Sequence, residues 1–148
     1  MTPMPNDLTS NEQTGLLLFA HGARDPQWAR PFLDVTRQCR LALGESVDAS
    51  AKLSRVALAF LEFMPPDLLA AGNALAARGC TRVDVVPLFL GAGGHVRKDI
   101  PVLMAQLQAT HPQVRWTLRQ AVGESPAVIL AMATQALASA DMPSVPLD

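Results

Sequence analysis

The sequence predicts an α/β fold: a single three-layer domain whose four-stranded parallel sheet has the strand order 2-1-3-4, with helices on both faces. Short apolar runs, such as 15–20 and 82–90, alternate with longer stretches in which apolar residues recur every three or four positions. Glycine and proline stand at the transitions. Four such strand–helix units favour parallel strands joined by right-handed crossovers. In this strand order the first and third strands are neighbours, and ligands bind at their carboxyl ends.

The first half of the chain predicts two strand–helix units. The run 15–20 is the first strand, and the helix after it accommodates Pro31 in its first turn and ends near Gly44. The apolar stripe of that helix consists of Trp28, Phe32, Val35, Cys39 and Leu43. The run 56–61 is the second strand. A second helix begins after Pro65-Pro66-Asp67 and ends at Arg78-Gly79, with a cation in its last turn and a glycine just beyond.

The second half predicts two more units. The third strand is 82–90, and the third helix ends at His111-Pro112. A fourth strand covers about 114–118. Glu124-Ser125-Pro126 then caps an alanine-rich helix that runs to about residue 140. We therefore expect one domain over 15–140, with flexible ends at 1–14 and 141–148.

The composition excludes several classes of protein. The 148 residues are 49% hydrophobic, which suits a well-buried α/β protein, and carry a formal charge of −1, so a basic surface for nucleic acid is not expected. No apolar run reaches the roughly 18 residues of a membrane span, and the first residues do not resemble a signal peptide. Cys39 and Cys80 are isolated and are expected to be reduced core thiols. These features predict a cytoplasmic protein without nucleic-acid or membrane partners.

Three side chains that suit metal chemistry follow predicted strands. His21 follows the first strand, Glu62 the second, and His95 lies in the glycine loop after the third. Because the carboxyl ends of parallel strands share one edge, we expect the three to converge there. Two imidazoles and a carboxylate suit cobalt, nickel, iron or zinc. The alternatives are structural: Glu62 as the cap of the helix near Pro66, and His95 as a turn residue.

The loop between the third strand and the third helix is rich in glycine. Gly93 and Gly94 would let the backbone approach a ligand closely, and the following helix could hold an anion at its amino end. Three cations flank the histidine loops and either bind a polyanionic substrate or are ordinary solvated charges; they are Arg24, Arg97 and Lys98. The third histidine, His111, fits a structural role at a helix carboxyl end.

Three segments, taken in order, resemble the motifs of a known family. They are LLLFAHGARDP (16–26), ALAFLE (57–62) followed by Pro65-Pro66, and VVPLFLGAGGHVRKDIP (85–101). The chain from about 15 to 137 is similar to the small sirohydrochlorin cobaltochelatases, which are short-form class II chelatases. It differs at Ala23, where the family commonly has serine.

The resemblance implies insertion of a divalent metal into sirohydrochlorin, a carboxylate-rich tetrapyrrole. It implies that His21 and His95 bind the metal or accept protons, that Glu62 assists, and that the nearby cations pair with substrate carboxylates. Cobalt is favoured as the metal, with iron and nickel as alternatives, and no organic cofactor is expected. The fold would be half of a class II chelatase, and a homodimer would supply both halves.

Two other functions remain open from the sequence. A cytosolic protein that binds metal or tetrapyrrole without turnover would use the same ligands. A hydrolase is disfavoured, because Ala20 precedes His21-Gly22 where histidine phosphatases have arginine, and no nucleophile-elbow motif is present.

Overall fold

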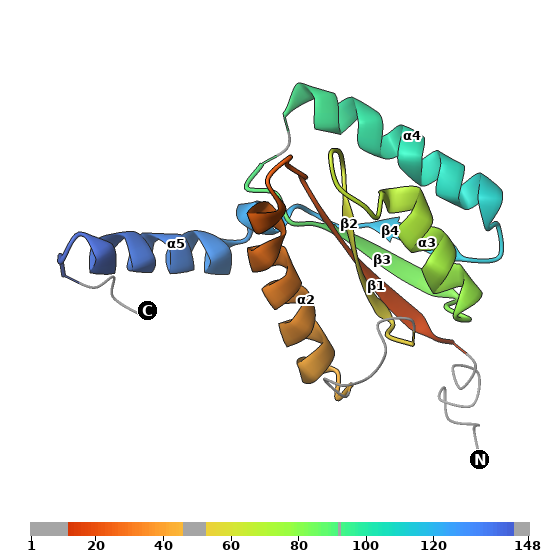
Figure 1. Ribbon diagram of the computed structural model, residues 1–148, viewed down its shortest axis with the longest axis horizontal. Coiled ribbons are helices and arrows are strands. Elements are labelled where there is room, and N and C mark those ends of the chain that lie inside the picture. The colour runs from red at the N-terminus through yellow and green to blue at the C-terminus, as the bar shows by residue number, and fades with distance from the viewer. Residues whose placement is uncertain (1–11, 46–52, 92, 144–148) are drawn as a thin grey trace, which may run out of the picture.

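The computed structural model describes residues 12–45, 53–91 and 93–143, with the side chain of His95 also outside the description. Its four strands form one parallel sheet of order β2-β1-β3-β4, which confirms the predicted topology. Figure 1 shows helices on both faces of this sheet. The predicted flexible ends fall mostly on residues outside the description, at 1–11 and 144–148.

The elements alternate as the sequence predicts. Along the chain they are β1 (Thr14–Ala20), the 3-10 helix η1 (Pro26–Ala29), α2 (Arg30–Ala42), β2 (Val56–Phe60), α3 (Leu68–Ala77), β3 (Arg82–Pro87), α4 (Gly94–Thr110), β4 (Arg115–Leu118), the 3-10 helix η2 (Val122–Glu124) and α5 (Pro126–Ser139). Pro31 stands at the start of α2 as expected. Gly44 and Gly79, just beyond α2 and α3, have positive φ angles of 78° and 91°, a conformation that glycine adopts without strain.

The two faces of the sheet are covered unequally. Helices α3 and α4 lie together on one face, and α2 lies on the other, where its main contact is with β2. The last helix, α5, leaves the body of the molecule instead of packing on the sheet (Figure 1). Strands β1 to β3 alternate their side chains between the faces, and the larger cluster of buried residues lies on the α3–α4 face.

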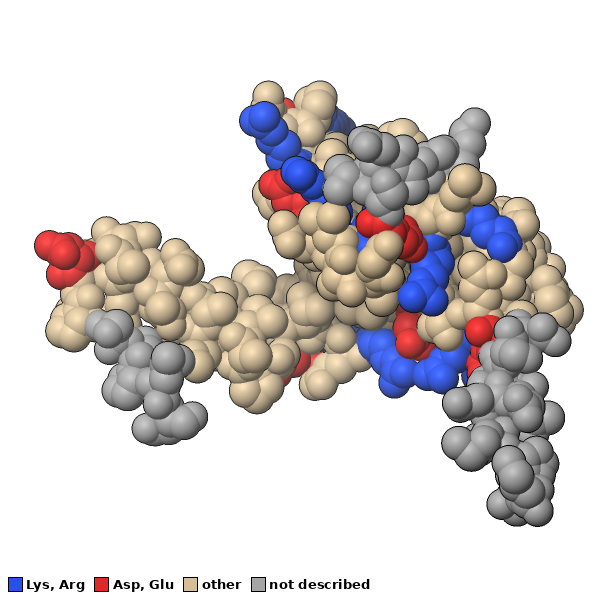
Figure 2. All heavy atoms as spheres, turned by 90° about the horizontal axis from the view of Figure 1, so that it is seen from below, with Lys and Arg blue, Asp and Glu red and all other residues tan. Residues whose placement is uncertain are grey.

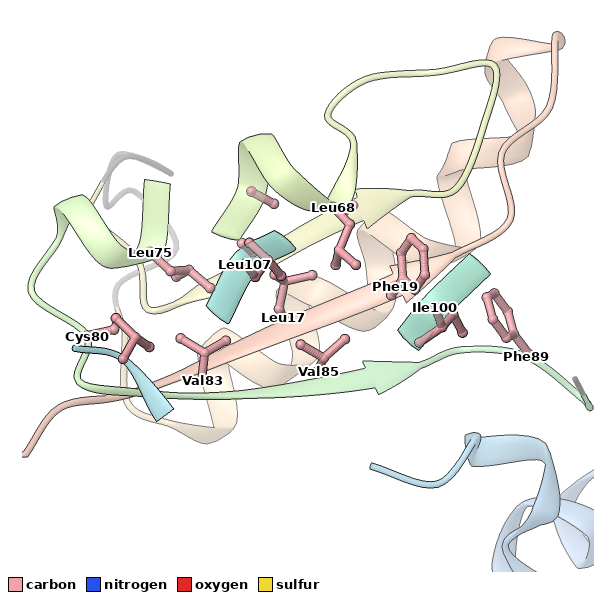
Figure 3. Close-up of a cluster of buried hydrophobic side chains, with 14 of the residues drawn as sticks. Leu17, Phe19, Leu68, Leu75, Cys80, Val83, Val85, Phe89, Ile100 and Leu107 are labelled. Carbon is pink, nitrogen blue, oxygen red and sulfur yellow. The ribbon is translucent and has the colours of Figure 1, made fainter. Parts of the chain in front are cut away.

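The main core lies between the sheet and helices α3 and α4 (Figure 3). Leu17 and Phe19 of β1 and Val83 and Val85 of β3 point into it, together with Leu107 of α4. All but Phe19 are aliphatic, as expected for strands covered on that face. Burying each of these side chains contributes about 1.5–3 kcal/mol to folding. The sheet that positions the carboxyl-edge loops is therefore a rigid platform.

Three local predictions need correction. Strand β3 ends at Pro87 rather than near Leu90, because its ladder with β4 stops at Val85 and its ladder with β1 stops at the pair Phe19 and Pro87. Helix α4 begins at Gly94, so His95 belongs to its first turn and not to a preceding loop. The side chain of Ser125 makes no capping hydrogen bond at the start of α5.

Candidate metal and tetrapyrrole site

Backbone hydrogen bonds bring three chain segments together at the carboxyl edge of the sheet. The Leu61 N–H donates to the carbonyl oxygen of Ala20 over 2.8 Å, and the Leu88 N–H donates to that of Phe19 over 2.7 Å. These bonds continue the β1–β2 and β1–β3 pairings past the last ladder residues. The segments that follow the three strands are consequently held side by side, which is the arrangement the sequence predicts.

Gly22 allows the loops after β1 and β2 to approach each other closely at this edge. A Cβ atom at this position would overlap the carbonyl oxygen of Glu62 and lie 2.9 Å from its carbonyl carbon. Any larger residue would therefore push the β1 loop away from the β2 loop. The His-Gly pair of the sequence thus has a steric purpose: glycine lets the histidine before it sit beside Glu62.

His21 and Glu62 face each other across these two loops. The Nδ1 atom of His21 lies 3.5 Å from Oε1 of Glu62, and the two side chains are 43% and 35% exposed. A carboxylate beside Nδ1 favours the tautomer with the proton on that nitrogen and leaves Nε2 free to bind a metal or accept a proton. Both groups remain in contact with solvent, so an incoming ion can reach them.

Aromatic side chains fix the position of His21. The ring of Phe89 lies against the imidazole with 4.4 Å between ring centroids. The indole N–H of Trp28 donates to the carbonyl oxygen of His21 over 2.8 Å. The ring of Phe89 thus restrains the imidazole directly, and the hydrogen bond from Trp28 restrains the backbone of His21. Sequence reasoning assigned Trp28 to the apolar stripe of a helix and missed this role.

The structural alternative for Glu62 is not supported. The cap of α3 is Asp67, whose carboxylate accepts a hydrogen bond from the Ala70 N–H over 2.8 Å. The Glu62 side chain is left facing His21. The structural role of His111 is confirmed, since this residue ends α4 and its Nε2 lies 2.6 Å from the side-chain oxygen of Asn73, in α3.

His95 lies in the first turn of α4, and only its backbone is described. Among the described side chains, no group of three histidine, cysteine, aspartate or glutamate residues is placed to hold a metal ion. Of the three predicted site residues, the structure therefore shows the side chains of His21 and Glu62 close together. The approach of the second imidazole stays a prediction, which the start of α4 at the same edge of the sheet allows.

A cavity of about 470 Å³ opens beside His21. Its walls are mostly apolar and aromatic, which suits the flat face of a macrocycle. The lining residues are His21, Trp28, Phe32, Leu88, Phe89, Leu90 and Gly91. This lining was not predicted from the sequence, although the apolar run Leu88-Phe89-Leu90 directly before the glycine loop indicates it.

The predicted glycines and cations are not among the residues that line this cavity. A Cβ atom at Gly93 or Gly94 would meet nothing within 4 Å, so packing within the described chain does not require glycine there. The Arg24 guanidinium lies 5.3 Å from the ring centre of Phe63. Phe63 itself has a φ angle of 68°, an unfavourable conformation that is concentrated at functional loops.

The two remaining cations, Arg97 and Lys98, are exposed in the first turns of α4. Arg97 also lines a smaller cavity of about 220 Å³ between α4 and the end of β4. Both are available to a polyanionic ligand.

Comparison with known proteins identifies the family. The sequence profile of the CbiX family matches residues 15–139, which is most of the chain. The chain belongs to the CbiX family. The predicted resemblance to small sirohydrochlorin chelatases is thereby confirmed. A sirohydrochlorin cobaltochelatase of Saccharolobus solfataricus is 36% identical over 90 residues, which are 61% of this chain and 62% of that protein. One from Sulfurisphaera tokodaii is 32% identical over 94 residues, 64% of this chain and 70% of that protein.

Solved structures show the same fold. A structure from Marinobacter aquaeolei VT8, described as a putative cobalamin biosynthesis CbiX protein, superposes with a TM-score of 0.71 and 29% identity, over 87% of this chain and 98% of that one. SirB from Bacillus subtilis, solved with Fe³⁺, gives a TM-score of 0.71 at 21% identity, over 88% of this chain but 48% of that one. The chain thus spans about half of SirB and about three fifths of the S. solfataricus relative.

Proposed function

We propose that this CbiX-family protein inserts a divalent metal ion into sirohydrochlorin. The observation that supports this most directly is the His21–Glu62 pair at the mouth of an apolar cavity, on the sheet edge where such folds bind ligands. We infer the substrate from relatives that are named sirohydrochlorin cobaltochelatase. We favour cobalt as the metal. Iron and nickel are alternatives, because histidine and carboxylate ligands suit all three metals.

The reaction requires a metal to lose water and a macrocycle to lose two pyrrole protons. In our proposal Nε2 of His21, together with His95, binds the hydrated ion loosely. Glu62 holds the proton on Nδ1 and so orients the ring. As the ion passes to the nitrogens of the macrocycle, the freed imidazoles and Glu62 accept the two pyrrole protons. They then release these protons to water, to which the side chains of His21 and Glu62 are exposed. A thiolate site would hold the metal too tightly for this transfer.

The walls of the cavity supply binding rather than chemistry. Trp28 and Phe32 on one side and Phe89 and Leu90 on the other offer apolar surfaces to the macrocycle. Arg24, Arg97 and Lys98 are then available for its carboxylates, and Gly93 and Gly94 let the backbone come close to it. Recognition would rest on apolar contact in the centre and charge at the rim.

We further propose that the active form is a homodimer in the cytoplasm. The chain spans about half of SirB, so two copies match the length of one such chain. Both cysteines are free thiols, which suits a reducing compartment. In the described part of the chain, no helix is long and apolar enough to cross a membrane.

The test is an anaerobic absorbance assay of sirohydrochlorin with Co²⁺, Ni²⁺ or Fe²⁺, using wild type, His21→Ala, His95→Ala and the control His111→Ala. We expect metalation to fall by about 10²–10⁴-fold in the first two variants and to stay near wild type in the third. His111 is the matched control because it is a histidine of the same domain that contacts Asn73 instead.

Two results would contradict the proposal. Wild-type rates in both His21→Ala and His95→Ala would remove the site assignment. Metalated product that never exceeds one equivalent of protein would favour the non-catalytic binding protein.

A further inference from the structure

The outer edge of the sheet at β2 lies in a groove between two helices. Strand β2 is an edge strand, and it contacts both α2 and α3, which lie on opposite faces of the sheet. A cavity of about 450 Å³ follows this edge, which is within the usual size of ligand-binding pockets. Its walls are mainly small and apolar, with Leu33 on the α2 side and Ala70 and Ala74 on the α3 side.

The backbone of β2 presents every second residue to this groove. The Leu16 N–H donates to the carbonyl oxygen of Arg55 over 2.8 Å, and in a parallel ladder alternate residues then bond to the neighbouring strand. The N–H and carbonyl groups of Val56, Leu58 and Phe60 therefore face away from β1 and toward the groove, which these three residues line.

Leu58 is the residue of this set whose backbone lacks partners. Side chains bond to both backbone groups of Val56, and the Phe60 N–H donates to the carbonyl oxygen of Pro66 over 2.8 Å. Within the described chain, neither the N–H nor the carbonyl oxygen of Leu58 has such a bond, although the residue is only 8% exposed. Buried backbone groups are normally paired, and an open strand edge is a template for another strand.

Two guanidinium groups close the groove near the start of β2. Arg40 of α2 donates from Nη2 to the carbonyl oxygen of Val56 over 2.8 Å and from Nε to the side chain of Ser54 over 2.9 Å. Arg78, at the end of α3, donates to the carbonyl oxygen of Ser54. Because each guanidinium has five N–H groups, most of those on this pair remain available to a ligand.

The charge of these two arginines is not balanced inside the groove. No aspartate or glutamate lines it, and neither arginine forms an ion pair with a carboxylate of the described chain. The carboxylate of Glu45 reaches Arg40 only through the hydroxyl of Ser54. The whole chain has a formal charge of −1, and Figure 2 shows basic and acidic side chains interspersed over the body. The excess of positive charge at this end of the groove is therefore local.

We propose that this groove binds the carboxyl-terminal end of an extended peptide, which adds to the sheet as a fifth strand antiparallel to β2. One peptide residue exchanges both of its backbone hydrogen bonds with Leu58. Val56, whose carbonyl oxygen Arg40 holds, is two residues or about 7 Å away, so the terminal carboxylate of a peptide that ends one or two residues later meets both guanidinium groups. The site is distinct from the cavity beside His21, with which it shares no lining residue.

A peptide fits the groove better than a simple apolar acid. An acyl chain would satisfy the arginines but leave the N–H and carbonyl groups of Leu58 unpaired. Side chains of an added strand alternate between the two faces, so one set meets Leu33 and the other meets Ala70 and Ala74. Apolar side chains are therefore preferred at both sets of positions.

The first test is affinity selection on the full chain from a library of random pentapeptides with free carboxyl ends, and from the same library with amidated ends. Wild type should retain free-acid peptides at least about 10-fold more than amidated ones. Ala74→Leu places a larger side chain in the groove and should abolish retention. The matched control is Ala77→Leu on the same helix, at an exposed position that does not line the groove. Equal or absent retention of the two libraries, or unchanged retention by a folded Ala74→Leu, would overturn the proposal.

The second test uses wild type alone, so it does not depend on the folding of a variant. Amide hydrogen exchange is followed by NMR with the most strongly retained peptide, and the Leu58 amide should exchange at least about 10-fold more slowly, whereas the amidated form of that peptide should leave it unchanged. An unchanged Leu58 rate would place the peptide elsewhere and refute the edge pairing. Complete displacement of the peptide by an equal concentration of octanoate would assign the groove to apolar acids and would also overturn the proposal.

Discussion

Replacing Gly22 by alanine should lower the free energy of unfolding by more than the small size of the change suggests, because there is no room for the added methyl group. Its Cβ would overlap the Glu62 carbonyl oxygen and lie 2.9 Å from the carbonyl carbon and 3.1 Å from Cγ of Met64, where ordinary contacts are 3.4–4 Å. The loops after β1 and β2 must therefore separate by more than about 1 Å, which also weakens the hydrogen bond from the Leu61 N–H to the Ala20 carbonyl oxygen.

The expected cost follows from these two effects. Overpacking costs about 1–3 kcal/mol, and a weakened backbone hydrogen bond adds about 1 kcal/mol, so the free energy of unfolding should fall by about 2–4 kcal/mol. For a chain of 148 residues this corresponds to a loss of roughly 5–15 °C in melting temperature. The separation also moves Glu62 away from His21, and chelation should fall by about 10–100-fold in protein that is still folded at 25 °C.

The assay is urea denaturation followed by circular dichroism, with Gly91→Ala as the matched control. A Cβ atom at Gly91 meets nothing within 4 Å, so this variant should stay within about 0.5 kcal/mol of wild type. If Gly22→Ala unfolds at the same urea concentration as Gly91→Ala, the two loops are not in tight contact, and the steric explanation of the His21–Glu62 geometry is refuted.

Three further outcomes are expected. Glu62→Gln keeps the size of the side chain but removes its charge, so chelation should drop about 10–100-fold with unchanged stability; a wild-type rate would exclude Glu62 from the reaction. Trp28→Phe removes the hydrogen bond to the His21 carbonyl and should lower the free energy of unfolding by about 0.5–1.5 kcal/mol in urea melts, whereas no change would show that the bond contributes nothing. Burial raises the pKa of the Cys80 thiol, so between the unfolded and the folded pKa the native state holds a proton that the unfolded state has lost. Stability should therefore decrease as the pH rises above the ordinary thiol pKa of about 8.5, and this extra decrease should vanish in Cys80→Ala; equal pH profiles would contradict it.

The parts of the fold that sequence could predict are those set by local patterns. Short apolar runs placed the strands, and proline and glycine marked the ends of α2 and α3, because the backbone preferences of these two residues are intrinsic. The strand order also followed, since crossovers of one hand leave few topologies for four parallel strands. These features together placed His21 and Glu62 at one edge before their distance was known.

The rest depends on contacts between distant segments. Nothing local to Phe89 indicates that its ring stacks on His21, because that contact arises only when the ends of β1 and β3 are side by side. The close approach at Gly22 likewise depends on the path of the β2 loop. The first turn of α4 was missed because Gly93 and Gly94 favour a loop, whereas the helix begins there with Gly93 as its cap.

Helix α5 shows the limit of pattern-based prediction most clearly. Its boundaries were predicted closely, but periodicity says nothing about what a helix packs against. The absence of charge over 126–139 was visible in the sequence and already indicated burial. Only the structure shows that the described body of the same chain does not bury this helix (Figure 1).

Helix α5 is linked to His21 through two contacts. The turn before α5 is bonded to Phe89 through Gly123, and the ring of Phe89 lies against the imidazole of His21. A displacement of α5 would therefore reach the imidazole of His21 by way of Phe89, which is itself part of the main core.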